Sequence, residues 1–344
     1  MSQALAEILA VVPLMLVALS LIVTAGLGVA VRTALRPTSK DMGWCLGRGE
    51  PTGPHDLGTT GREITLRLAD QHTTVAWEID GQPTNSNSPA RPCVLIVHGH
   101  TASRYQALAT TAPLLPHASR VITFDLPGHG DATATTCTLG VREPADIAAI
   151  IHQVRQRLDE TDPRTPLIVF GWSMGAQSAL AAVANLNDTK AVAGLVLLGV
   201  YRTFAEPLPG HARRQGVPPW IIVPPTRAIL RRILGPGIHF DRTADAAKLS
   251  CPLLLLHGEH DDLCPLPGAQ ALADAAHQAN VETHLEVFRG GGHTRLTHTH
   301  TEQYTQTLAA FLQRFGNNTD TQPGITPTRP ADDAAAPEPS HETP

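Results

Sequence analysis

Three polar residues of the types that cooperate in nucleophilic catalysis, Ser173, Asp261 and His293, each follow a short apolar run in this sequence. A serine hydroxyl is a poor nucleophile at neutral pH, because it must lose its proton as it attacks. A histidine can accept that proton, and a carboxylate can orient the imidazole and stabilise its charged form. If the fold brings the three side chains together, the chemistry they predict is attack of the serine on an acyl carbon.

The serine is the centre of the pentapeptide GWSMG, residues 171–175, which links the apolar run 167–170 to a stretch of small residues typical of a helix. The pentapeptide alone is consistent with an accidental match, since G-x-S-x-G is common in glycine-rich chains. Its strand-like and helix-like flanks favour a nucleophile elbow, a sharp turn with the serine at the apex. Gly171 and Gly175 permit such a turn because they lack side chains.

The acid and the base are expected where other strands end. In a parallel sheet, functional groups collect at the carboxyl ends of the strands. Asp261 follows the run LLLL, and His293 follows the last predicted strand behind three glycines. The chain order is therefore Ser173, Asp261, His293. Asp262 is adjacent to Asp261 and competes with it for the role of the acid.

The pattern of apolar runs predicts an α/β fold. Continuous apolar runs are typical of strands covered on both faces, and helix-like segments separate them here. This alternation predicts a mostly parallel sheet, with the first two strands as an antiparallel hairpin at one edge. The predicted strands are residues 64–68, 74–79, 94–97, 121–124, 167–170, 195–198, 253–256 and 285–288.

The domain boundaries follow from changes in composition. We expect an N-terminal transmembrane anchor at 1–36, a linker at 37–61 that acts as a tether, and one domain at 62–315. Residues 201–249 interrupt the alternation and carry seven prolines, as an insertion over the active-site end of the sheet would. The tail 316–344 is rich in proline and poor in large apolar residues, which predicts disorder.

The anchor prediction rests on residues 8–31, which are 24 consecutive uncharged residues. Such a run can cross a hydrocarbon core of about 30 Å as a helix. A cleaved signal peptide would have a basic start and a shorter apolar core, and a buried core helix would have polar interruptions. Arg32, Arg36 and Lys40 follow the run and nothing basic precedes it, so the positive-inside rule predicts a single-pass protein with its catalytic domain in the cytoplasm.

The overall composition limits the kinds of partner that we expect the protein to bind. The formal net charge of −5 and the lack of a basic stripe argue against nucleic acid. Five scattered cysteines without C-x-x-C spacing indicate neither a disulfide framework nor a zinc site, and we expect no metal. The sequence leaves the oligomeric state open.

Taken together, the segments VLIVHGHTAS, FDLPGHGDA, GWSMGAQS, HGEHDDLCP and GGGH resemble the α/β-hydrolase superfamily, most closely its monoacylglycerol-lipase-like and S33 serine-aminopeptidase-like branch. The resemblance covers about three quarters of the chain. It implies a mainly parallel eight-stranded sheet and a triad of Ser173, Asp261 and His293, with Asp261 preferred by its spacing to Pro265. It further implies an oxyanion hole from the backbone amides of His100 and Met174.

One departure from the family pattern is Ala132, which stands where a serine is usual after the Asp125 motif. The activity implied is hydrolysis of carboxylic esters, lipid-derived esters among them, through an acyl-enzyme and without a cofactor. Two alternatives stay open. The same residues serve a peptidase or amidase, and a non-catalytic binding module on a hydrolase scaffold would share the fold.

Overall fold

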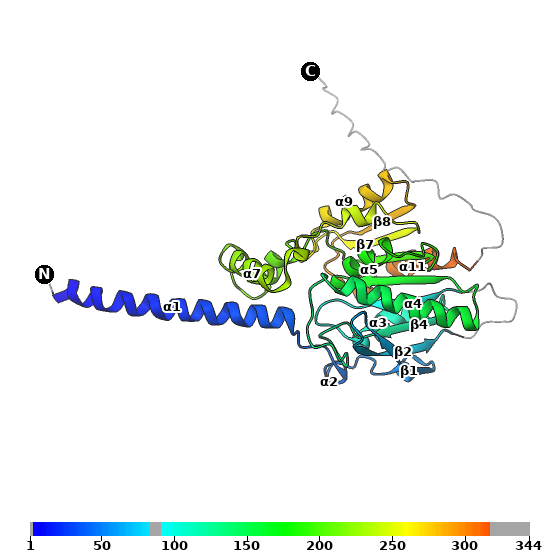
Figure 1. Cartoon of the computed structure of the whole chain (residues 1–344), viewed down its shortest axis with the longest axis horizontal. Helices are drawn as coiled ribbons and strands as arrows, with labels where there is room; N and C mark the ends of the chain where they lie inside the picture. The colour runs from blue at the N-terminus through cyan, green and yellow to red at the C-terminus, as the bar shows by residue number, and fades with distance from the viewer. Residues whose placement is uncertain (1–2, 83–90, 317–344) are drawn as a thin grey trace, which may run out of the picture.

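The computed structural model describes residues 3–82 and 91–316. Figure 1 shows a twisted sheet with helices on both faces, and one long helix, α1, which extends away from the sheet domain. The strands are β1 (Gly61–Arg67), β2 (Thr73–Asp80), β3 (Cys93–Val97), β4 (Arg120–Phe124), β5 (Leu167–Trp172), β6 (Gly194–Leu198), β7 (Leu253–Gly258) and β8 (Thr283–Phe288).

The helices alternate with the strands after β3. They are α1 (Gln3–Leu35), α2 (Met42–Leu46), α3 (Arg104–Thr111), α4 (Glu143–Thr161), α5 (Met174–Ala184), α6 (Pro207–Arg214), α7 (Pro219–Leu234), α8 (Thr243–Ala246), α9 (Leu266–Gln278), α10 (Leu296–Thr299) and α11 (Thr301–Gln313), with short 3-10 turns at Pro54–Leu57, Ala112–Leu114 and Pro236–His239.

The sheet order is β1-β2-β4-β3-β5-β6-β7-β8. β1 pairs antiparallel with β2, and β2 pairs antiparallel with β4, whereas all later pairings are parallel. The prediction of a mostly parallel eight-stranded α/β sheet with an antiparallel edge hairpin is therefore confirmed. Each of the eight predicted runs lies on a strand, although the run 64–68 extends one residue beyond β1.

Side chains alternate between two apolar layers because successive residues of a strand point to opposite faces. In β3, Leu95 and Val97 join the layer that α4, α5 and α9 cover, whereas Val94 and Ile96 join the layer under α3 and α11. All five residues of this strand are buried. A fully covered central strand explains why the sequence shows continuous apolar runs instead of alternation.

The segment 37–61 differs from the expected tether. It contains α2 and the turn Pro54–Leu57, and Cys45 is fully buried. The Asp41 side chain caps α2 by accepting a hydrogen bond from the Trp44 amide at 2.9 Å. Glycine and proline punctuate this stretch because it turns tightly against the domain surface.

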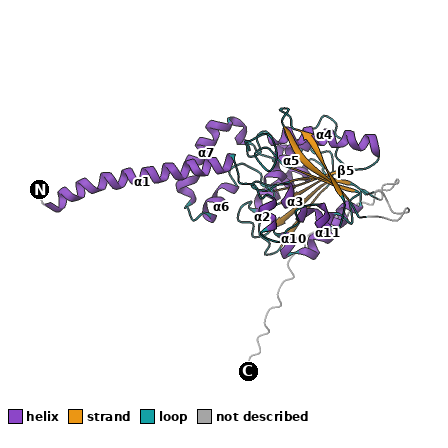
Figure 2. Ribbon diagram, turned by 90° about the horizontal axis from the view of Figure 1, so that it is seen from below, coloured by secondary structure: helices purple, strands orange, loops and turns teal. Residues whose placement is uncertain are grey.

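One helix of the described residues, spanning Val11–Leu35, is long and apolar enough to cross a membrane. It lies within α1, and Figure 2 shows α1 as a single continuous rod. The predicted disordered tail, apart from Gly316, lies outside the described residues.

Candidate active site

Ser173 occupies the sharp turn between β5 and α5. Its backbone has φ 53° and ψ −120°, a left-handed conformation that non-glycine residues rarely adopt. The Ser173 amide donates a hydrogen bond to the Leu198 carbonyl at 2.9 Å, which ties the turn to β6. Such strain at an apex is typical of a serine presented as a nucleophile.

The two glycines of the turn are required by close packing. A Cβ on Gly171 would lie 2.7 Å from the Gly175 carbonyl oxygen, and a Cβ on Gly175 would lie 2.3 Å from that of Val97. Both obstacles are backbone atoms, which cannot rotate away. The structure thus places the predicted elbow glycines where only a hydrogen fits.

His293 and Asp261 reach Ser173 from the ends of β8 and β7. The Nε2 atom of His293 lies 3.0 Å from the Ser173 Oγ, and its Nδ1 atom lies 2.7 Å from the Asp261 Oδ2. The other carboxylate oxygen of Asp261 accepts hydrogen bonds from the amides of Leu263 and Cys264 at 2.9 and 2.8 Å. The Asp261 side chain is fully buried, so its carboxylate is held in one orientation.

Asp262 points elsewhere. Its carboxylate bonds to the guanidinium of Arg214 in α6, with Nε and Oδ2 3.0 Å apart, and its side chain is 55% exposed. The hydrogen bond from Arg214 lowers the pKa of Asp262. Of the two adjacent acids, only Asp261 contacts the imidazole of His293.

The amides expected to form an oxyanion hole flank the same space. His100 and Met174 both line the cavity that contains Ser173. Within the described residues, neither backbone amide has a hydrogen-bond acceptor. Met174 is the first residue of α5, where the helix presents free N–H groups and a positive partial charge. Free donors beside a serine hydroxyl are suited to a developing oxyanion.

Three histidines support the loop after β3. His98 accepts a hydrogen bond from the Leu126 amide at 2.9 Å, and His129 accepts one from the Thr101 amide at 3.1 Å. His100 bonds through Nε2 to the Ala34 carbonyl of α1 at 2.9 Å. Burial lowers the pKa of all three, which keeps their rings neutral. The side chain of His100 is half-buried against the end of α1.

Among the residues that the structure describes, two groups of donor atoms lie close enough to hold a metal: His100, His129 and Cys137, and Asp261, Cys264 and His293. In the first group, both histidines already bond to backbone atoms, and burial raises the pKa of the Cys137 thiol well above its usual value. In the second, Asp261 and His293 bond to each other. The observed hydrogen bonds and the protonated thiol therefore explain both groups of atoms better than metal binding does.

The cavity beside Ser173 has a volume of about 380 Å³, within the range of small-molecule sites. The insertion 201–249 supplies much of its wall through Tyr201, Phe204 and residues of α6 and α7. The last turns of α1 supply more, through Ala30, Thr33 and Ala34. The contribution of α1 could not be identified from sequence, because these residues lie within or just beyond a uniformly apolar run.

Comparison with known proteins identifies the family of the fold. Residues 94–310 match the model of the Alpha/beta hydrolase family. The chain belongs to the alpha/beta hydrolase family. This hydrolase superposes on an esterase from Pyrococcus furiosus with a TM-score of 0.63 and 19% identity, over 78% of this chain and 95% of that one.

The relatives of this alpha/beta hydrolase include an esterase and a lipase. Esterase YjfP of Escherichia coli is 27% identical over 208 residues, which are 56% of this chain and 78% of that protein. Lysophosphatidylserine lipase ABHD12 of Danio rerio is 26% identical over 201 residues, which are 55% of this chain but only 48% of that protein. The hydrolase thus matches most of one relative and about half of the other.

Proposed function

We propose that this protein is a membrane-anchored serine hydrolase that cleaves carboxylic esters with Ser173, His293 and Asp261 as its catalytic triad. The hydrogen-bonded series from Asp261 Oδ2 through His293 to Ser173 Oγ is the observation that carries the proposal. The esterase and lipase names of its relatives support ester hydrolysis as the activity.

In the acylation step, the Ser173 oxygen attacks the ester carbonyl while its proton moves to His293 Nε2. Asp261 accepts the hydrogen bond from His293 Nδ1 and stabilises the imidazolium. The carbonyl oxygen becomes an oxyanion that receives hydrogen bonds from the amides of His100 and Met174. Collapse of this intermediate expels the alcohol, which takes the proton from His293.

Deacylation repeats these roles with water. His293 removes a proton from the water molecule as it attacks the acyl-serine carbonyl, and the same two amides stabilise the second oxyanion. The proton then returns to the Ser173 oxygen as the carboxylic acid leaves. Every proton transfer in this cycle involves side chains of the chain itself, so the proposal requires no cofactor.

The insertion 201–249 acts as a lid over this site. Ile222, Val223 and Leu230 of α7 face the cavity, whereas Arg227 and Arg231 of the same helix are exposed. A mostly apolar cavity favours an acyl chain as the bound group, and exposed arginines can meet anionic headgroups. Esters with medium or long acyl chains, such as monoacylglycerols or lysolipids, are therefore the proposed substrates. An ordinary covering helix with a solvated basic face is the alternative for α7.

Helix α1 anchors the domain in a membrane, and Arg32, Arg36 and Lys40 place that domain on the cytoplasmic side by the positive-inside rule. An apolar helix near the N-terminus is also compatible with a signal sequence. Retention of full-length protein in membranes after carbonate washing would support the anchor. Protease added to intact cells should leave the domain uncut, and rapid digestion would reverse the orientation.

Hydrolysis of matched ester and amide substrates tests the proposed activity. The p-nitrophenyl ester and the p-nitroanilide of one acyl group share the cavity contacts and differ in the bond that breaks. We expect turnover of the ester to exceed that of the anilide and to be lost in Ser173→Ala. A faster anilide would favour a peptidase or amidase, and no turnover of either would favour a binding module.

A further inference from the structure

The membrane-proximal helix changes character along its length. Between Val11 and Gly26, every side chain of α1 that the structure describes is exposed. From Leu27 onward, one side of the helix is half-buried. The half-buried residues are Leu27, Ala30, Val31, Ala34 and Leu35. Their spacing of three and four residues places them on a single face of the helix.

This face packs against the insertion and borders the cavity. Val31 and Leu35 contact the apolar cluster that contains Leu230 of α7 and Phe204. Ala30, one turn before Ala34, lines the cavity that also contains Ser173. Figures 1 and 2 both show α7 beside the domain end of α1. The wall of the cavity is thus shared between α1 and the lid.

Backbone hydrogen bonds fix the end of α1. The Ala34 carbonyl accepts a hydrogen bond from His100 Nε2, and the Leu35 carbonyl accepts one from the Cys137 amide, both at 2.9 Å. The last carbonyls of a helix lack partners within the helix, so these donors satisfy them. His100 supplies one of the proposed oxyanion amides, which links α1 directly to the catalytic loop.

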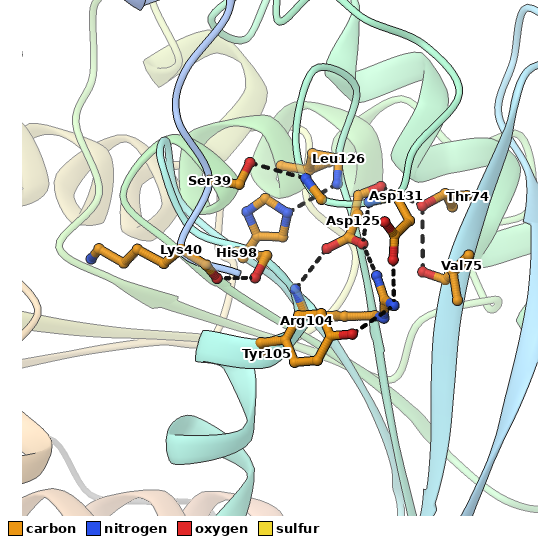
Figure 3. Close-up of polar contacts among 12 residues, drawn as sticks. Ser39, Lys40, Thr74, Val75, His98, Arg104, Tyr105, Asp125, Leu126 and Asp131 are labelled. Carbon is orange, nitrogen blue, oxygen red and sulfur yellow. Dashed lines mark hydrogen bonds and ion pairs between the residues drawn. The ribbon is translucent and has the colours of Figure 1, made fainter. Parts of the chain in front are cut away.

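The residues after α1 are held as firmly. The Lys40 amide donates to the Thr101 carbonyl at 3.0 Å, and the Lys40 carbonyl accepts from the Ser103 hydroxyl. Ser39 accepts a hydrogen bond from the Gly130 amide at 3.0 Å. Figure 3 shows the contacts of Ser39 and of the Lys40 carbonyl beside His98 and the buried Arg104. The segment that connects α1 to the domain is therefore held against the domain by hydrogen bonds at Ser39 and Lys40.

The part of α1 before Leu27 is long enough to span a bilayer by itself. At 1.5 Å per residue, the stretch 3–26 measures about 36 Å, and the hydrocarbon core is about 30 Å thick. The bilayer would then end near Leu27, where the half-buried face begins. On α7, Trp220 and Ile233 are 78% and 53% exposed, as side chains that contact a lipid interface would be.

We infer that the half-buried face of α1 forms a wall of the acyl site, with Ala30 limiting the length of acyl chain that the site accepts. This inference rests on the proposed ester hydrolysis. The acyl chain of a membrane lipid would pass from the bilayer along α1 and α7 to Ser173, so one helix serves as anchor and as part of the substrate pocket. Ala30 and Thr33 are therefore specificity-determining residues.

A substitution in α1 of the full-length protein tests this role. Ala30→Trp places a large side chain in the cavity, whereas Val29→Trp places the same group on the adjacent position, which is 61% exposed and does not line the cavity. Both variants would be assayed in detergent micelles with the butyrate and laurate esters of p-nitrophenol. We expect Ala30→Trp to lower the laurate-to-butyrate ratio of kcat/KM by about tenfold or more and Val29→Trp to leave it within about twofold.

Unchanged ratios in both variants, or equal losses in both, would overturn the inference. Butyrate turnover shows that Ala30→Trp has folded. Direct binding separates this inference from the proposed function, because it needs no turnover. In a Ser173→Ala background, dansyl-labelled undecanoic acid should bind about tenfold more weakly to Ala30→Trp than to Val29→Trp. Equal affinities would refute the α1 wall even if the protein proved to be no esterase.

Discussion

The imidazole of His100 bonds to the Ala34 carbonyl across 2.9 Å, which joins the loop after β3 to the last turn of the long N-terminal helix. Because burial lowers the pKa of His100, its ring is neutral and donates through Nε2. The same residue offers its backbone amide to the cavity beside Ser173. We therefore expect a change in the position of α1 to alter the position of a proposed oxyanion donor.

Loss of this bond should impair the site without removing any triad residue. In His100→Leu, the Ala34 carbonyl loses its donor, which costs about 1–3 kcal/mol if that oxygen stays shielded from water. We expect a lower free energy of unfolding and a several-fold lower kcat for a short ester. His100→Gln keeps an N–H donor and should recover part of both. Identical kinetics in His100→Leu and the parent would show that α1 does not influence the loop.

The two adjacent acids should differ sharply. Asp261→Asn removes the carboxylate that contacts His293 and should lower kcat by roughly 10³-fold or more. Asp262→Asn breaks only an exposed ion pair with Arg214 and should change kcat by less than about twofold. Steady-state kinetics on a short ester measures both. A larger loss of kcat in Asp262→Asn than in Asp261→Asn would show that Asp262 is the catalytic acid.

The elbow glycines should tolerate no side chain. In Gly175→Ala, the new Cβ would lie 2.3 Å from the Val97 carbonyl oxygen, and we expect a loss of stability above about 2 kcal/mol or failure to fold. Gly28→Ala is the matched control, because a Cβ there meets nothing within 4 Å and alanine favours a helix. Denaturant unfolding in detergent compares the two. Equal stabilities would mean that the turn is more open than the structure shows.

The buried ion pair behind the catalytic loops should be important for stability. Asp125 is fully buried and bonds to the guanidinium of Arg104, whose side chain is 3% exposed, and to the Arg104 and Asp131 amides (Figure 3). Asp125→Ala leaves the Arg104 guanidinium with the exposed carboxylate of Asp131 as its remaining partner and removes the acceptor of two amides, so it should lower the free energy of unfolding by about 3 kcal/mol. Asp70→Ala, at an exposed acid, is the control. Equal midpoints in urea would contradict this role.

Much of the fold is evident from sequence, because a strand covered on both faces leaves an unmistakable apolar run. The central strands, such as β3 and β5, are recognisable on that basis, whereas the partly covered β1 and β8 show shorter, mixed runs. The helices α4 and α11 are recognisable by their position between or after these runs. The neighbourhood of Ser173 could be expected too, since a parallel sheet brings the ends of β5, β7 and β8 to one edge. The catalytic roles themselves stay predictions.

The role of α1 could not be predicted from sequence. A helix face that contacts protein and a face that contacts lipid are both apolar, so Leu27 and Val31 resemble the residues before them. The packing of the segment after α1 against the domain could not be predicted for another reason. Its contacts run through backbone atoms of Lys40, Thr101 and Leu35, which carry no signal of residue type. Glycines and prolines are as typical of a flexible tether as they are of a segment that packs against a domain.

Covalent labelling of Ser173 tests the central claim most directly. The full-length protein in detergent would be treated with a fluorophosphonate and its mass compared with that of the Ser173→Ala variant treated alike. We expect one adduct on the parent protein, mapped by peptide mass spectrometry to residue 173, and none on the variant. No adduct on the folded parent, or an equal adduct on Ser173→Ala, would contradict the assignment of Ser173 as the nucleophile.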